Sequence, residues 1–192
     1  MRFEKGQKER TRSHILETAS RRFRKDGIAG SGIATIMADA GLTNGAFYVH
    51  FESKEALVRE ALEATLVRQR DKLSAEAGGN GDLEAAVRSY LDQAHVVEPN
   101  VGCPSAALLP EIGRQPLQTK QEYEAGLIKY LRVLASFLPE PESPAAMRRA
   151  MEIFGCMVGA LQLARAVADP TLSNGMLEGG IEAALSLAKL PL

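Results

Sequence analysis

The sequence predicts an all-α protein built from a small N-terminal helical bundle and a larger C-terminal helical domain. Apolar residues recur every three or four positions along most of the 192 residues, as they do on one face of a helix. No stretch alternates between apolar and polar residues in the manner of a strand. Hydrophobic residues make up 45% of the chain, enough for a substantial buried core. We expect the two domains to be residues 1–52 and 53–192.

Residues 33–51 predict two short helices joined by a tight turn. The first helix has one apolar face, made of Ile33, Ile36, Met37 and Ala40. Gly41 follows directly, where a residue with positive φ would end that helix. Thr43 can cap the next helix through its hydroxyl. Phe47 and Phe51, four residues apart, then anchor this second helix to a core. The layout is that of a helix-turn-helix, whose second helix enters the major groove of DNA.

The flanking segments are predicted as further helices. A first helix over residues 8–27 has an apolar face made of Ile15, Ala19 and Phe23. Residues 27–32 interrupt this pattern, and Ser31 is a candidate cap for the helix that follows. Ser53 is expected to cap a longer helix, and the glycine-rich residues 77–81 to form a loop. The later helices are expected at residues 54–75, 82–97, 102–109, 117–137, 145–168 and 173–189.

The charge distribution favours an N-terminal domain that binds a polyanion. Residues 1–50 contain nine Lys or Arg and five acidic residues, a net charge of +4 against −5 for the remainder. A solvated basic helix face would give the same charge, so charge alone does not decide between the two. The two cysteines, Cys103 and Cys156, form neither a disulfide framework nor a metal-ligand spacing. We therefore expect no metal and no cofactor.

Neither a membrane protein nor an enzyme is expected. The most apolar run, residues 153–164, is shorter than the roughly 20 residues of a membrane-spanning helix. The charged N-terminus has no apolar signal core, so we expect a cytoplasmic protein. The three histidines, His14, His50 and His95, have no nearby cysteine or carboxylate cluster. No glycine-rich phosphate loop or nucleophile elbow appears either.

This combination resembles the TetR family of bacterial transcriptional repressors. The resemblance rests on residues 15–19, Phe23, Gly27, Ile36, the run Ala-Gly-Leu-Thr-Asn-Gly at 40–45, Phe47, Tyr48, His50, Phe51 and residues 53–57. Gly102-Cys103-Pro104 also resembles a motif that one TetR subgroup carries at the start of its sixth helix. The resemblance implies a homodimer with about nine helices per subunit, in which three N-terminal helices bind double-stranded DNA. It further implies a small-molecule pocket in the larger domain. The last two helices, here about 145–168 and 173–189, would form the dimer interface.

Carried over onto this sequence, the resemblance implies which side chains meet the DNA backbone. Tyr48 and Lys54 would contact phosphates. His50 would be a second backbone contact or, alternatively, a histidine packed beside Phe51. Thr43 would cap its helix and could also donate to a phosphate. Arg10, Thr11 and Arg12, at the start of the first helix, would lie close to the DNA backbone.

Fewer groups are available to read bases. Asn44 is the candidate, because its amide can donate and accept at adenine. Gly45 and Ala46 lack bulk and would let the helix approach closely, and Ala46 could touch a thymine methyl group. Two-fold symmetry predicts a palindromic operator, with recognition helices about 34 Å apart.

The middle helices would line the pocket of a small-molecule effector of unknown identity. The candidate lining residues are Tyr90, Cys103, Leu108, Tyr123, Leu127, Tyr130 and Phe137. Each is alternatively an ordinary core residue, and the scarcity of charge among them favours an apolar or weakly polar ligand. Ligand binding would shift the population away from the DNA-binding arrangement.

Three alternatives stay open. Cys103 precedes Pro104 at a predicted helix start, which could make it a redox or electrophile sensor, although a small packed residue is the other interpretation. The protein could regulate transcription without any ligand. It could also activate rather than repress, because promoter position decides between these outcomes.

Overall fold

In the computed structural model, which describes residues 6–78 and 82–191, the chain is helical throughout. The described residues form nine α-helices, two 3₁₀-helices and no strand, which confirms the predicted all-α fold. In chain order the elements are α1 (Gln7–Gly30), α2 (Ile33–Asp39), η1 (Asn44–Val49), α3 (Lys54–Gly78), α4 (Leu83–Tyr90), α5 (Gln93–Val97), η2 (Pro99–Val101), α6 (Pro104–Ile112), α7 (Leu117–Ala135), α8 (Pro144–Ala166) and α9 (Pro170–Lys189).

The N-terminal helices share one hydrophobic core that helices of the larger domain complete. Side chains of α1, α2, η1 and the segment between η1 and α3 are almost fully buried in it: Ile15, Phe23, Ile36, Met37, Phe47 and Phe51. Leu57 and Val58 of α3 belong to the same cluster, and α6 and α7 add Leu108 and Tyr123. Packing therefore continues across the expected boundary after residue 52, which stays a prediction.

The end of α1 is kinked at Gly27, where the sequence predicts a break. Gly27 has φ +80°, a conformation that L side chains rarely adopt. Ser31 does not cap α2 as expected, because its hydroxyl donates to the Gly27 carbonyl at 2.7 Å. That carbonyl is available since the kink interrupts the helical hydrogen bonding. The N-cap position of α2 is instead Gly32, which has no side chain to make a capping bond.

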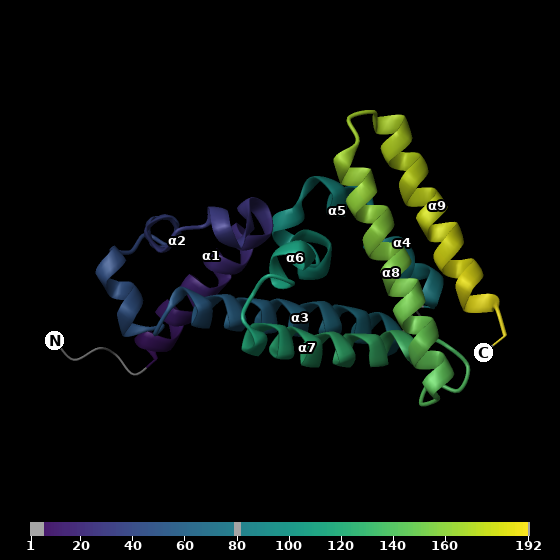
Figure 1. Cartoon of the computed structure of the whole chain (residues 1–192), viewed down its shortest axis with the longest axis horizontal. Helices are drawn as coiled ribbons and strands as arrows, with labels where there is room; N and C mark the ends of the chain where they lie inside the picture. The colour runs from purple at the N-terminus through teal and green to yellow at the C-terminus, as the bar shows by residue number, and fades with distance from the viewer. Residues whose placement is uncertain (1–5, 79–81, 192) are drawn as a thin grey trace.

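The long helix α3 joins the two ends of the molecule, and α7 runs alongside it (Figure 1). Ser53 caps α3 as predicted, since its hydroxyl accepts the Ala56 N–H at 3.1 Å. Gly126 of α7 allows close packing, because a Cβ there would lie 2.7 Å from Cδ1 of Leu66 on α3. The helix α3 continues to residue 78, into the segment predicted as a loop at 77–81, and residues 79–81 lie outside the described part of the chain.

The helices α8 and α9 pack against each other at the end of the molecule opposite the helix-turn-helix (Figure 1). Gly180 of α9 lies directly over Ala160 of α8, where an added Cβ would come within 2.4 Å of the Ala160 Cβ. Buried residues of α8 face the core of the larger domain, including Ile153, Met157 and Leu161. None of the described helices combines the length and apolar character needed to cross a membrane.

The single helix predicted over residues 82–97 is wrong. The structure has two short helices there, α4 and α5, separated at Leu91 and Asp92. The physical reason is that Asp92 starts a new helix: its carboxylate accepts the His95 N–H at 2.7 Å. This break turns α5 toward α6 and places His95 beside the start of α6.

Candidate nucleic-acid interface

The second helix of the motif is the short 3₁₀-helix η1, and one of its faces is exposed. Asn44 and Gly45 are exposed at its start, and Tyr48 and Val49 are 67% and 61% exposed. Phe47, on the opposite face, is completely buried. The element therefore presents a free surface from a fixed scaffold, as reading a groove requires.

The turn before η1 fixes the direction of this helix. Gly41 has φ +68°, as predicted for the residue that ends the first helix. The next N–H, of Leu42, donates to the Met37 carbonyl at 2.8 Å, and the Leu42 side chain packs against the N-terminal core. Thr43 occupies the N-cap position, but the predicted capping bond is absent. The 3₁₀ geometry is tighter than an α-helix, and the Ala46 N–H bonds to the Thr43 carbonyl instead.

Two aromatic contacts hold Tyr48 outward. The rings of Phe47 and Phe51 stack, with centroids 5.7 Å apart, and thereby pin η1 to the core as predicted. The Tyr48 ring meets the Phe47 ring edge-on, with centroids 5.1 Å apart. This contact leaves Tyr48 largely exposed, and its contact with a phosphate stays a prediction.

His50 lies beside the basic start of α1. Burial lowers the pKa of His50, and the positive charges of Lys8 and Arg12 lower it further. Its Nδ1 is buried without a hydrogen-bond partner among the described residues. Lys8 was not among the predicted contact residues, although it lies two residues before Arg10 in the same basic stretch. The exposed cation beside His50 and η1 makes this surface suited to a phosphate.

Arg12 and Lys54 make contacts within the protein. The Arg12 guanidinium pairs with Glu60 of α3 and lies over the Phe51 ring, 4.6 Å from its centroid. The Lys54 ammonium donates to the Ile28 carbonyl at 2.6 Å, near the end of α1. Both side chains therefore position α1 against α3. Lys54 retains two further donors for a phosphate, whereas the Arg12 guanidinium is already engaged.

The seven residues predicted to line an effector pocket do not meet around one cavity. Leu108 and Tyr123 belong to the N-terminal core, where the Tyr123 hydroxyl bonds to Ser105 at 2.7 Å. Burial raises the pKa of Tyr123 to about 12. The other core of the protein contains Tyr90, Cys103 and Tyr130, with Phe137 packed against it and Leu127 touching both cores. Two of the described cavities are large enough for a small molecule, with volumes of about 320 and 180 Å³. Of the seven residues, Tyr90 lines the smaller of these two, and none lines the larger.

Cys103 is only 2% exposed, and its N–H donates to Nε2 of His95 at 3.0 Å. An oxidant would reach this thiol only after the contact between α5 and α6 opened. The sensing role stays a prediction that the geometry does not favour.

Comparisons with known proteins agree with this geometry. A family model for bacterial regulatory proteins of the tetR family matches residues 15–61, which contain the helix-turn-helix. The transcriptional regulator AcrR of Shigella flexneri is 34% identical over 109 residues, 56% of this chain and 50% of AcrR. TtgR of Pseudomonas putida is 42% identical over 60 residues, 31% of this chain and 29% of TtgR. The matched part thus spans half or less of the length of these curated relatives, both of which are named as regulators rather than enzymes.

Similarity to solved structures extends over nearly the whole chain. The crystal structure of E. coli NemR in its reduced form has a TM-score of 0.76 and 21% identity, covering 95% of this chain and 98% of NemR. At that identity the likeness establishes the fold. Residues 15–61 therefore belong to the TetR family of bacterial regulatory proteins, and the whole chain shares the fold of solved TetR-family regulators.

Proposed function

We propose that this protein is a repressor that binds a palindromic operator as a homodimer and is released by a small-molecule effector. The observation that carries the proposal is the exposed face of η1, held by buried Phe47 and flanked by Lys8 and His50. Asn44 would read a base from this face, while Tyr48 would fix the register on the backbone.

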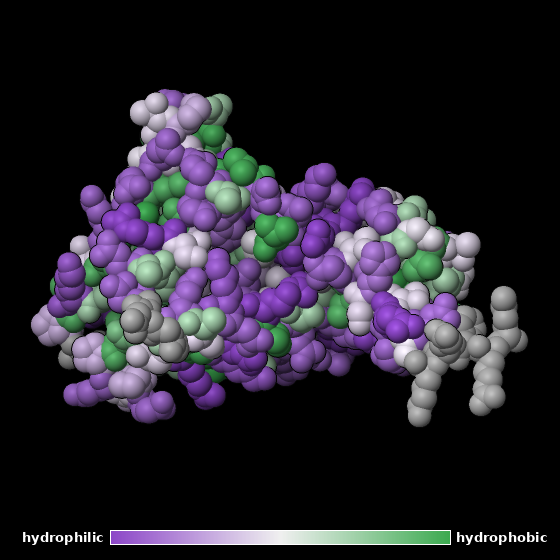
Figure 2. Space-filling model, turned by 180° about the vertical axis from the view of Figure 1, so that it is seen from behind, coloured by the Kyte–Doolittle hydropathy of each residue, from purple (hydrophilic) through white to green (hydrophobic). Residues whose placement is uncertain are grey.

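The faces of α8 and α9 that point away from the core support a dimer. Met151, Leu163 and Leu172 are each about half exposed. The same helices carry glycines with open space where a Cβ would stand: Gly155, Gly159, Gly175 and Gly179. Apolar patches interrupt the hydrophilic surface at this end of the molecule (Figure 2). A two-fold axis there would pair α8 and α9 with their copies and would match a palindromic operator.

Contacts between the two parts of the chain supply a route for release. The end of α1 packs against α6 and η2, so a ligand that moves either element moves the helix-turn-helix. The Ala29 N–H of α1 donates to the Glu111 carboxylate of α6 at 2.9 Å. An effector would shift the population only as far as its affinities for the two arrangements differ.

Selection of bound sequences from random double-stranded DNA, followed by affinity measurements over a salt series, tests the proposal. We expect a palindromic consensus and a steep loss of affinity with salt. Tyr48→Phe should weaken all sequences alike, and Asn44→Ala should relax preference at one position in each half-site. Lys54→Ala should lower the salt slope by about one, whereas Lys120→Ala on α7 is the matched control. An unchanged slope for Lys54→Ala would remove Lys54 from the interface.

A further inference from the structure

A cavity of about 180 Å³ lies between α3, α4 and the segment from α5 to the start of α6. A single water needs only ~10–15 Å³ of such volume, so a small organic molecule fits. Its polar side chains come from separate elements: Gln69 and Lys72 from α3, Ser89 and Tyr90 from α4, Asp92 from the start of α5 and His95 from α5. A smaller cavity of about 20 Å³ shares Gln69, Lys72 and Ser89 and extends toward Tyr130.

The polar groups of this cavity differ in whether they already have partners. His95 has both ring nitrogens engaged, with Nδ1 2.7 Å from the Tyr90 carbonyl and Nε2 accepting the Cys103 N–H. The Asp92 carboxylate is also engaged, since it accepts the His95 N–H at 2.7 Å. In contrast, the side chains of Gln69, Lys72 and Ser89 form no hydrogen bond or ion pair with other described residues. The available groups are thus an ammonium, an amide and a hydroxyl, which together suit a carboxylate.

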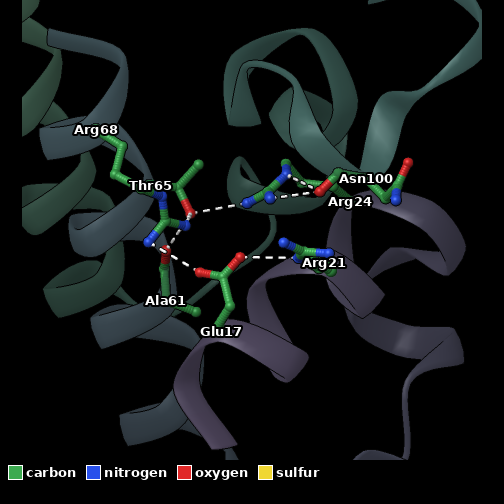
Figure 3. A network of polar contacts seen from close by, with 7 residues as sticks. All are labelled: Glu17, Arg21, Arg24, Ala61, Thr65, Arg68 and Asn100. Atoms are coloured by element: carbon green, nitrogen blue, oxygen red, sulfur yellow. Dashed lines mark hydrogen bonds and ion pairs between the residues drawn. The ribbon is translucent and has the colours of Figure 1, made fainter. Parts of the chain in front are cut away.

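One wall of the cavity is connected to α1 of the N-terminal domain through hydrogen bonds. Val101 and Gly102 form this wall, and Gly102 packs so closely on the His95 ring that a Cβ would lie 2.3 Å from Nε2. The preceding residue, Asn100, accepts two hydrogen bonds on its carbonyl from Arg24 of α1, one of them 2.9 Å long. Figure 3 shows Arg24 between Asn100 and Thr65, so displacement of the wall would reach α1 directly.

We propose that this cavity binds a small organic carboxylate through Lys72, Gln69 and Ser89. Occupancy moves the Val101–Gly102 wall and, through the Asn100 carbonyl and Arg24, alters the position of α1. The effect on DNA rests on the proposed function above, whereas the binding of the carboxylate does not. The cavity offers an ammonium, an amide and a hydroxyl to its ligand, in contrast to the apolar or weakly polar effector expected from the sequence.

Calorimetric titration with straight-chain monocarboxylates from acetate to octanoate, and with benzoate and salicylate, tests the binding step. The corresponding neutral amides are the ligand controls. We expect at least one carboxylate to bind and its amide to bind far more weakly. Lys72→Met should weaken carboxylate binding by ~10- to 100-fold, the equivalent of one charge-assisted hydrogen bond. Lys129→Met is the matched control, because Lys129 lies in the separate groove between α3 and α7.

Three outcomes would overturn the proposal: no carboxylate of the series binds, amides bind as well as carboxylates, or Lys129→Met loses as much affinity as Lys72→Met. The second step is tested by DNA affinity with and without the carboxylate that binds. In the wild type it should weaken DNA binding by about 5-fold or more, and in Arg24→Met this effect should shrink while carboxylate affinity is kept. An undiminished effect in Arg24→Met would refute the route. If the wild type binds no DNA, the proposed function fails. The proposed carboxylate site is then still supported if calorimetry shows binding that depends on Lys72.

Discussion

Replacing Arg24 by Met removes a buried guanidinium that joins three segments of the chain. Arg24 is 6% exposed, and its Nη1 donates to the Thr65 hydroxyl at 2.8 Å while Nε and Nη2 donate to the Asn100 carbonyl. Met has a similar length but no donors, so the substitution removes these bonds and keeps much of the packing. Thr65 keeps its bond to the Ala61 carbonyl (Figure 3).

Two opposing effects set the size of the loss. Leaving the Asn100 carbonyl without its donors costs about 1–3 kcal/mol. Burial lowers the pKa of Arg24 to about 10, and the nearby Arg68 charge adds to this, so the fold already disfavours the guanidinium charge. Removing that charge offsets part of the lost bonding. We therefore expect a net loss of about 1–2 kcal/mol, a fall in Tm of roughly 2–8 °C for a chain of this size.

Thermal and urea unfolding followed by circular dichroism measures this loss, and Arg68→Met is the matched control. Arg68 belongs to the same network, since it bonds to Glu17 at 3.1 Å and to Thr65 at 3.2 Å. Its side chain is 47% exposed, so its removal should cost less than about 1 kcal/mol. Equal losses for the two variants would refute the reasoning, because the burial of Arg24 would then have no energetic consequence.

Three further predictions concern other parts of the fold. Gly27→Ala should cost about 1–3 kcal/mol in unfolding free energy, because φ is positive there and the new Cβ would meet the Glu111 carboxylate; full stability in denaturant would contradict this. Burial lowers the pKa of His95 below 6.5, so the unfolded chain binds the proton more readily and stability falls as the pH drops through 6.5. His95→Gln, which keeps an acceptor for the Cys103 N–H, should flatten the dependence of Tm on pH, and an unchanged slope would exclude His95. Leu163→Glu should convert a dimer to monomers in sedimentation, while a persisting dimer would place the interface elsewhere.

Local patterns in the sequence predicted the N-terminal core well. Helical spacing predicted that four residues would be buried, and all of them are: Ile15, Phe23, Phe47 and Phe51. The prediction succeeds because the apolar face of a helix is determined by residues only a few positions apart. Local signals also contained the break that was missed, because Asp92 is a strong helix-starting residue inside the segment taken as one helix.

Contacts between distant residues could not be predicted in this way. Arg24 looks like a surface arginine in a basic helix, and its partner Asn100 is 76 positions away. The residues predicted to line the pocket are divided between two cores for the same reason: the spacing of the tyrosines predicts that they face inward, but not toward which core. Tyr123 faces the N-terminal core and Tyr130 the other, although both lie on α7.

The net charge of +4 over residues 1–50 overstates the positive charge that is available to attract DNA. Four arginines of α1 form ion pairs or hydrogen bonds within the protein: Arg12, Arg21, Arg22 and Arg24. Their charges are largely balanced by acidic partners or, for Arg24, buried, so they contribute little to attraction at the operator. Attraction at the operator therefore depends on the cations near η1, such as Lys8, whose charge acts on His50 at the end of η1. Lys8→Ala should accordingly lower the salt slope of DNA binding more than Arg22→Ala does, although both remove one positive charge; equal slopes would mean that net charge, rather than position, governs the attraction.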